Sequence, residues 1–161
     1  MKSYYNDCEK QIKGNCMTHN HLKEIHKINY LNQEMDALYH QSSLKLGISD
    51  SVSMVMYTIY DRGNECKLSD IYKSTGISKQ TINSAIRQLE TKGILYLEMY
   101  NGKQKKVMLT EKGKCFVEQT AARLFQAESD TFNDWTEEEI STYIGLMEKH
   151  EACFRRQIEK M

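Results

Sequence analysis

Between Ser78 and Gln88 the sequence is dense in side chains that donate hydrogen bonds or carry positive charge. Hydroxyl, amide and guanidinium groups of this kind hydrogen-bond to base edges in duplex DNA, and lysine neutralises phosphates. Apolar residues recur among them at steps of three and four, which predicts a helix with one buried and one polar face; they are Ile82, Ala85, Ile86 and Leu89. We predict DNA contacts from the polar face, at Ser78, Lys79, Gln80, Thr81, Asn83, Ser84 and Arg87.

A second basic segment follows this helix. Asn101-Gly102 is the strongest short signal for a hairpin turn, and residues 94–100 and 105–109 flank it with strand-forming side chains. Three lysines stand at the turn and just after it, so the hairpin can lie along the minor groove or its phosphates. We predict contacts from Asn101, Lys103, Lys105 and Lys106. The alternative is that each lysine is only a solvated hairpin charge.

The elements around these residues form a helix-turn-helix pattern. A short helix over 70–75, capped by Ser69, precedes Gly76, and the polar-faced helix over 79–92 follows it, capped by Ser78. Helical periodicity also appears over 18–45, 49–61 and 111–128. A capping box at Thr136–Glu139 begins a last helix, with an apolar stripe from Ile140 to Ile158.

Charge is distributed unevenly along the 161 residues, although the net charge is zero. The balance of Lys and Arg against Asp and Glu is −1 over residues 1–66, +6 over 67–114 and −5 over 115–161. A basic centre between neutral and acidic ends is typical of a DNA-reading module on an oligomerisation scaffold.

Two stretches make the resemblance to a known family specific. They are LSDIYKSTGISKQTINSAIRQLETKGIL at 68–95 and VMLTEKGK at 107–114. With their Lys92-Gly93-Ile94 and Leu109-Thr110-Glu111-Lys112-Gly113 segments, the chain resembles the MarR family of bacterial regulators over roughly residues 20–158. The resemblance implies an all-α homodimer with a small two-stranded β-wing, which binds double-stranded DNA and acts as a repressor.

The domain organisation follows from the same resemblance. Residues 1–17 are expected to be a loose extension, and 49–110 the winged helix-turn-helix DNA-binding region. Residues 18–48 and 111–161 are expected to form the helical dimerisation region, all within one integrated domain.

Two positions depart from the family pattern. Leu97 stands where the family often has an arginine, and Asn101-Gly102-Lys103 replaces an Asp-x-Arg whose arginine reaches into the minor groove. Lysine keeps the charge but loses the planar fork, so weaker or less selective binding by the wing is expected.

Other residues raise the question of what the protein senses. Five cysteines are expected to be reduced thiols: Cys8, Cys16, Cys66, Cys115 and Cys153. The position of the reactive cysteine in peroxide-sensing relatives is Ile25 here, so that thiol switch is not supported. A sensing role for Cys8 or Cys16, or for His19, His21 and His26 as metal ligands, stays open, although no metal or other cofactor is predicted.

A small aromatic ligand is the effector that the resemblance implies. The side chains expected to line its pocket are Tyr30, Tyr39, His40, Tyr57 and Tyr60. Tyrosines at helical spacing are also common packing residues, which is the competing interpretation.

The remaining function classes find little support. No phosphate loop, nucleophile elbow or metal-protease motif is present, so an enzyme is not expected. No signal-like or membrane-spanning stretch occurs, which predicts a cytoplasmic protein that binds no membrane. The alternative function is a protein-binding or metal- or redox-responsive winged helix with weak DNA binding.

Overall fold

The computed structural model describes residues 21–161, so the expected extension over 1–17 and the first residues of the first helix lie outside it. By its internal contacts the chain forms two compact units, Met1–Gly47 and Ile48–Met161. In the first unit, α2 (Leu22–Lys45) is one long helix that ends just before Gly47. Gly47 has φ +69°, a conformation that glycine adopts without the strain of a side chain.

An apolar stripe on α2 remains exposed within its unit. Ser43 is the one buried residue that α2 contributes, whereas large apolar side chains recur along the helix at three- and four-residue steps with 40% or more of their surface exposed. They are Leu22, Ile25, Ile28, Leu31, Met35 and Leu38.

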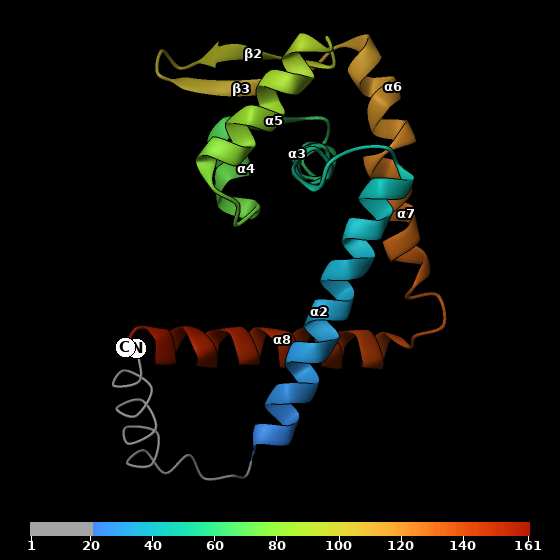
Figure 1. The fold of residues 1–161 in the computed structure, drawn as a ribbon, viewed down its shortest axis with the longest axis vertical. Helices are drawn as coiled ribbons and strands as arrows, with labels where there is room; N and C mark the ends of the chain where they lie inside the picture. Colours follow the sequence, from blue (N-terminus) through green and yellow to red (C-terminus); the bar gives the residue numbers. More distant parts are fainter. Residues whose placement is uncertain (1–20) are drawn as a thin grey trace, which may run out of the picture. The chain divides into compact units, whose positions relative to one another are not determined.

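The second unit holds nine elements (Figure 1). In chain order they are α3 (Asp50–Asp61), β1 (Glu65–Lys67), α4 (Leu68–Ser74), α5 (Lys79–Thr91), β2 (Leu95–Tyr100), β3 (Gln104–Leu109), α6 (Glu111–Gln119), α7 (Ala121–Asp130) and α8 (Glu137–Ile158). Ser49, Ser78, Thr110 and Thr136 cap their helices with side-chain oxygens, and the capping box at Thr136–Glu139 is confirmed.

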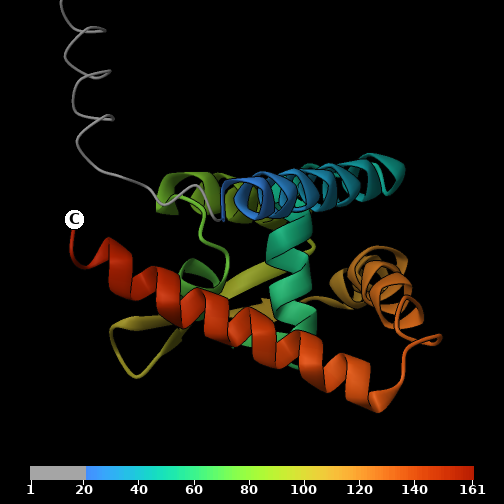
Figure 2. The same cartoon turned by 90° about the horizontal axis from the view of Figure 1, so that it is seen from below.

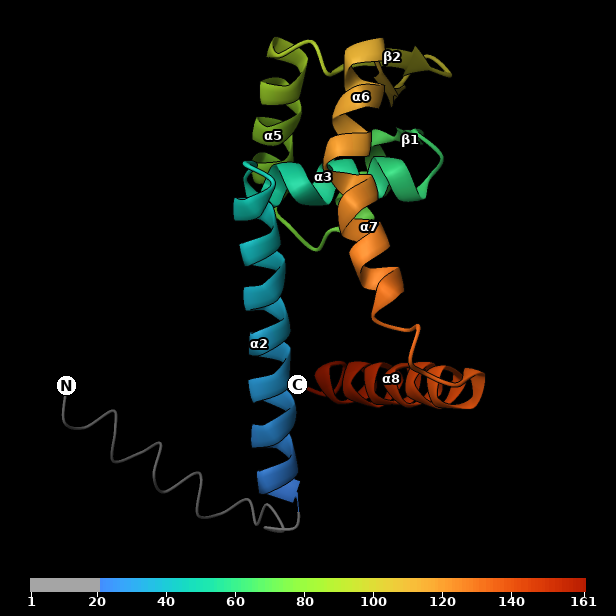
Figure 3. The ribbon, with the colours of Figure 1, turned by 90° about the vertical axis from the view of Figure 1, so that its right-hand side faces the viewer.

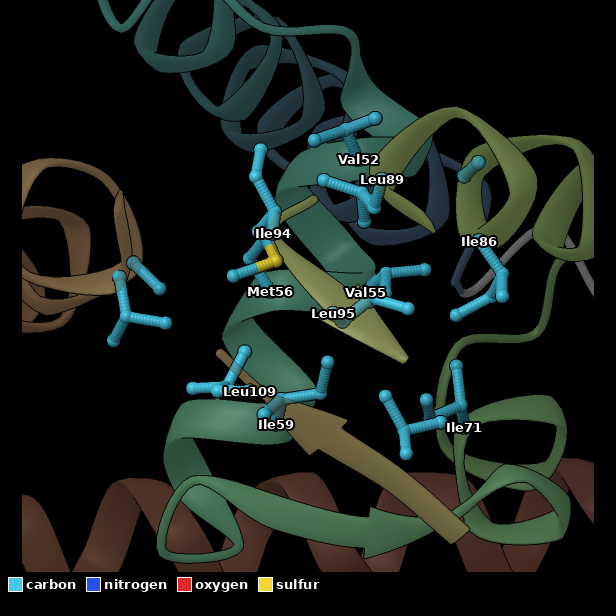
Figure 4. Close-up of a cluster of buried hydrophobic side chains, with 14 of the residues drawn as sticks. Val52, Val55, Met56, Ile59, Ile71, Ile86, Leu89, Ile94, Leu95 and Leu109 are labelled. Atoms are coloured by element: carbon cyan, nitrogen blue, oxygen red, sulfur yellow. The ribbon is translucent and has the colours of Figure 1, made fainter. Parts of the chain in front are cut away.

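The core of this unit is built around α3. Val55, Met56 and Ile59 are fully buried and pack with Leu95 and Leu109 of the wing strands (Figure 4). Ile71 of α4 and the apolar face of α5 complete the cluster. Because α3 touches α4, α5 and β1, and β1 pairs with β3, α3 supports both the helix-turn-helix and the hairpin.

The predicted two-stranded wing is a three-stranded antiparallel sheet with the order β1-β3-β2. Cys66 of β1 lies opposite Val107 of β3, and both side chains are buried. β1 is only three residues long, and its partner strand is far along the chain. Its pairing therefore leaves no local signal of the kind that a hairpin turn provides.

Two helix boundaries also differ from the sequence-based expectation. α4 begins at Leu68, directly after β1, rather than at Asp70 behind a Ser69 cap; the Ser69 hydroxyl instead lies 3.4 Å from the Asp70 carboxylate. The expected helix over 111–128 is two helices, α6 and α7, which meet at a bend (Figure 3). Thr120 occupies the bend with φ −126° and ψ −86°, and its buried side chain donates to the Phe116 carbonyl.

α8 is one continuous helix (Figure 2). None of its residues is buried. Large apolar side chains on it are 44% to 61% exposed; they are Tyr143, Ile144, Leu146, Met147, Phe154 and Ile158. Across residues 21–161, no helix is both long and apolar enough to cross a membrane.

Candidate nucleic-acid interface

α5 presents the predicted polar residues together on one exposed face. Its apolar residues Ile82, Ala85, Ile86 and Leu89 are each no more than 3% exposed. The opposite side carries the exposed residues Ser78, Lys79, Gln80, Thr81, Asn83, Ser84, Arg87 and Gln88. A helix anchored by this apolar stripe can offer its other face to the major groove without disturbing the core.

The start of α5 is held by its own side chains. The Thr81 backbone N–H donates to Ser78 Oγ over 3.2 Å, and the hydroxyls of Ser78 and Thr81 lie 2.9 Å apart. These bonds keep both hydroxyls in place at the N-terminal turn, where further backbone N–H groups can meet a phosphate.

Tyr72 of α4 belongs to this surface, although the sequence analysis did not single it out. Its hydroxyl donates to Asn83 Oδ1 over 2.6 Å, and Lys79 Nζ lies 5.7 Å from its ring centroid. The sequence contains one indication of this position. Tyr72 is an aromatic residue that directly follows Ile71, which faces inward from the first helix of the helix-turn-helix.

The turn of the wing presents cations to solvent. Asn101 and Gly102 have φ values of 50° and 72°, so both adopt the left-handed conformation that Asn and Gly tolerate best. The loop between the strands comprises Asn101, Gly102 and Lys103, because Tyr100 pairs with Gln104. Lys103 and Lys105 are exposed, and their contact with phosphates stays a prediction.

Lys106, the third lysine, has a carboxylate partner. Its Nζ donates to Glu65 Oε1 over 2.6 Å, and this hydrogen bond raises the pKa of Lys106. In the sheet, Lys106 lies between Lys67 of β1 and Glu98 of β2. The Glu65 carboxylate therefore partly neutralises the charge of Lys106 within the protein. The sequence pattern treated Lys103, Lys105 and Lys106 alike as cations that contact DNA.

One junction ties the end of α5 to the wing and to α6. The Thr110 hydroxyl donates to the Gly93 carbonyl over 2.7 Å and accepts from the Gly113 N–H over 3.0 Å, while the Thr110 N–H donates to the Ile94 carbonyl. A Cβ on Gly113 would lie 1.9 Å from the Ile94 oxygen, so this position requires glycine. The Leu-Thr-x-x-Gly segment thus aligns α5 with the hairpin.

The predicted pocket residues fall in both units. Tyr57 and Tyr60 pack on Phe125 of α7, with ring centroids 5.9 and 5.5 Å apart, and the Tyr57 hydroxyl donates to Glu128 over 2.5 Å. Tyr30, Tyr39 and His40 lie on α2 in the other unit. A shallow hollow along α8 is lined by other residues, Glu137, Ile140, Ser141, Ile144, Gly145 and Glu148. The tyrosine-lined pocket stays a prediction.

The thiols that the structure describes are free. Cys66 is buried, and burial, followed by the nearby Asp70 charge, raises its pKa to about 11. Cys115 is exposed and Cys153 half-buried. Cys8, Cys16 and His19 lie outside the described residues, and within 21–161 no three His, Cys, Asp or Glu side chains are grouped to hold a metal ion.

Comparison with known proteins agrees with this architecture. Residues 46–99 match the sequence model of the MarR family, whereas no curated protein sequence matches the chain. NMB1585, a MarR family regulator from Neisseria meningitidis, has a TM-score of 0.75 and 12% identity, over 85% of this chain and 97% of that one.

Two further structures are similar in fold. MepR of S. aureus, in complex with DNA, has a TM-score of 0.63 and 19% identity, over 79% of this chain and 93% of that one. BpsR of Bordetella bronchiseptica, whose DNA binding is regulated by 6-hydroxynicotinic acid, has a TM-score of 0.59 and 20% identity, over 78% and 98%.

The fold and its exposed α5 face define a winged helix-turn-helix protein. Residues 46–99, from before α3 into β2, match the MarR family model, and the chain has the fold of the MarR family regulators. The resemblance stated from the sequence and the mostly helical fold class with a small wing are therefore confirmed.

Proposed function

We propose that this protein is a transcription regulator that binds duplex DNA as a homodimer and acts as a repressor. The observation that carries the proposal is the exposed face of α5, where hydroxyl, amide and cationic side chains stand together on a core-anchored helix. The wing adds Lys103 and Lys105 beside it. The DNA complex of MepR, which shares this fold, supports the same use of the surface here. A protein that works on the chromosome in this way acts in the cytoplasm.

The dimer follows from the apolar stripes on α2 and α8. Burying a side chain such as Ile144 or Phe154 is worth about 1.5–3 kcal/mol each, so two stripes of this size favour a partner over water. A second copy related by a two-fold axis would place two α5 helices on one duplex. Such a dimer should read an inverted repeat with half-sites about 10 base pairs apart.

Release by a small aromatic ligand is the regulatory part of the proposal. The Tyr57, Tyr60 and Phe125 cluster supplies the aromatic surface that such a ligand needs. BpsR, which shares this fold, is regulated by 6-hydroxynicotinic acid.

The test is selection of bound fragments from random DNA, followed by titration of Arg87→Ala against the selected operator. If Arg87 reads a guanine, its loss should weaken operator binding by about 1–3 kcal/mol. Gln119→Ala, an exposed change on α6 outside the α5 face, serves as the matched control and should bind as the wild type does. Failure of the wild-type protein to select any sequence would overturn the proposal.

A further inference from the structure

Asn83 of the α5 face has its side chain held by a residue of another helix. Tyr72 reaches across from α4, which packs against α5, and donates its phenolic proton to Asn83 Oδ1 over 2.6 Å. Tyr72 is half-buried against the core cluster, so its ring is held by packing rather than by the hydrogen bond alone. The Asn83 amide is thus aligned by a neighbour with a fixed position.

The direction of this hydrogen bond decides what Asn83 can offer to DNA. An amide has an accepting oxygen at one end and two N–H donors at the other. Since the oxygen faces Tyr72, the NH2 group is the end available to a partner outside the protein. Lys79, one helical turn earlier on the same face, lies over the Tyr72 ring and adds a cation to the same place.

An asparagine that reads adenine uses both ends of its amide, accepting from N6 and donating to N7. Guanine presents two acceptors, N7 and O6, along the same edge. An Asn83 that offers donors suits the guanine edge, while the amide oxygen held by Tyr72 is poorly placed to accept from adenine N6. We therefore infer that Tyr72 is a positioning residue that sets Asn83 to read guanine in each half-site, an inference that rests on the proposed DNA-binding function.

The variant Tyr72→Phe isolates the hydrogen bond. Phenylalanine keeps the ring, its packing and its contact with Lys79, and removes only the hydroxyl that holds Asn83 Oδ1. Once released, the amide can turn and present both ends to adenine. A bidentate pair discriminates strongly between bases, so the preference for guanine over adenine should fall by about tenfold.

The experiment compares base preferences across a randomised half-site library for the full-length wild type, Tyr72→Phe, Asn83→Ala and the double variant. The position that loses its preference in Asn83→Ala is the one that Asn83 reads. We expect guanine there for the wild type, a shift toward adenine for Tyr72→Phe, and no further change when Tyr72→Phe is added to Asn83→Ala. Thermal unfolding of each variant checks that the fold is kept.

Several outcomes would overturn the inference alone: adenine preferred by the wild type at that position, an unchanged preference in Tyr72→Phe, or an equal shift when Asn83 is already alanine. The same holds if Asn83→Ala alters no position of a selected operator. Absence of any selected sequence for the wild type would overturn the proposed function, and this inference with it.

Discussion

Gly113 shows how one residue controls the joint between α5, the wing and α6. Its backbone is so close to the Ile94 carbonyl that an added Cβ would lie 1.9 Å from the oxygen and 3.3 Å from the Leu109 Cβ. Both neighbours are parts of the wing's base and cannot move without shifting the strands. This one glycine thus fixes the position of the wing beside α5, the helix that we propose to bind DNA.

Gly113→Ala is expected to lower the free energy of unfolding by about 1–3 kcal/mol or more, because overpacking at a rigid backbone has no flexible side chain to absorb it. Thermal and urea unfolding measure the effect. Gly145→Ala is the matched control: its site on the exposed surface of α8 has open space, and alanine should stabilise the helix by about 0.5–1 kcal/mol. Equal stability of Gly113→Ala and the wild type would contradict the geometry at Ile94.

Cys66 and Cys115 differ in exposure and should differ in reactivity. Burial raises the pKa of Cys66 to about 11, so at pH 8 almost no thiolate is present, and the sulfur is also shielded from solvent. We expect iodoacetamide to label Cys115 in the native protein and Cys66 only after denaturation, as mapped by peptide mass. Native labelling of Cys66 as fast as Cys115 would show that β1 opens readily.

At the scale of elements, the three lysines of the wing differ in whether a carboxylate partner is present. Lys103 and Lys105 are exposed on the hairpin, whereas Lys106 donates to Glu65 and so links β3 to β1. A cation already paired with a carboxylate releases fewer counterions when it approaches a phosphate.

The salt dependence of DNA binding distinguishes these lysines. Lys103→Ala and Lys105→Ala should each lower the salt slope by about one per wing, or about two per dimer, and weaken operator and random DNA by similar factors. Lys106→Ala should lower the slope less. Selective loss of operator binding in Lys103→Ala, with the slope unchanged, would mean instead that Lys103 reads the minor groove.

The start of α8 depends on the protonation of Glu139. The backbone N–H and hydroxyl of Thr136 donate to its carboxylate, which lowers the pKa of Glu139. A lowered folded-state pKa means that the ionised group stabilises the helix start above the usual glutamate pKa. This stabilisation is lost as the pH falls through the lowered value.

Acidification should therefore increase amide exchange in the first turn of α8, as followed by hydrogen exchange of residues 138–141 after correction for the intrinsic rate. In Thr136→Ala the first turn should exchange faster at neutral pH and respond less to acid, because the hydroxyl that caps the helix is gone and the Glu139 carboxylate keeps only the backbone N–H of residue 136 as a donor. An identical acid response in both proteins would contradict the role of the capping box.

At the scale of the whole molecule, the exposed apolar stripe of α8 predicts self-association. Met147, 56% exposed, lies on the same side of the helix as Ile144 and Phe154, whereas Thr142 lies on the opposite side. Met147→Glu should convert the dimer to monomer in sedimentation at micromolar concentration, since it buries an unpaired charge in the interface. Thr142→Glu adds the same charge off the stripe and should leave the dimer intact. A wild-type protein that is a stable monomer under these conditions would contradict the dimer.

Local patterns in the sequence were enough for most of the fold and for the composition of the exposed α5 face. The three- and four-residue steps of α5 separated Ile82 and Leu89 from Asn83 and Arg87, Asn101-Gly102 marked the hairpin turn, and Thr136–Glu139 marked the start of α8. These features depend on residues within about one or two turns of each other, so periodicity and capping report them directly. The domain boundaries, the DNA contacts and the ligand pocket remain predictions.

Only the tertiary structure revealed what distant residues do to one another. The pairing of β1 with β3, the Glu65–Lys106 hydrogen bond and the approach of Gly113 to Ile94 join segments that are far apart in the chain. The hydrogen bond from Tyr72 to Asn83 crosses from one helix to the next and depends on how the two helices pack. Contacts of this kind follow from the packing of the common core around α3, and the spacing of side chains along the chain does not predict them.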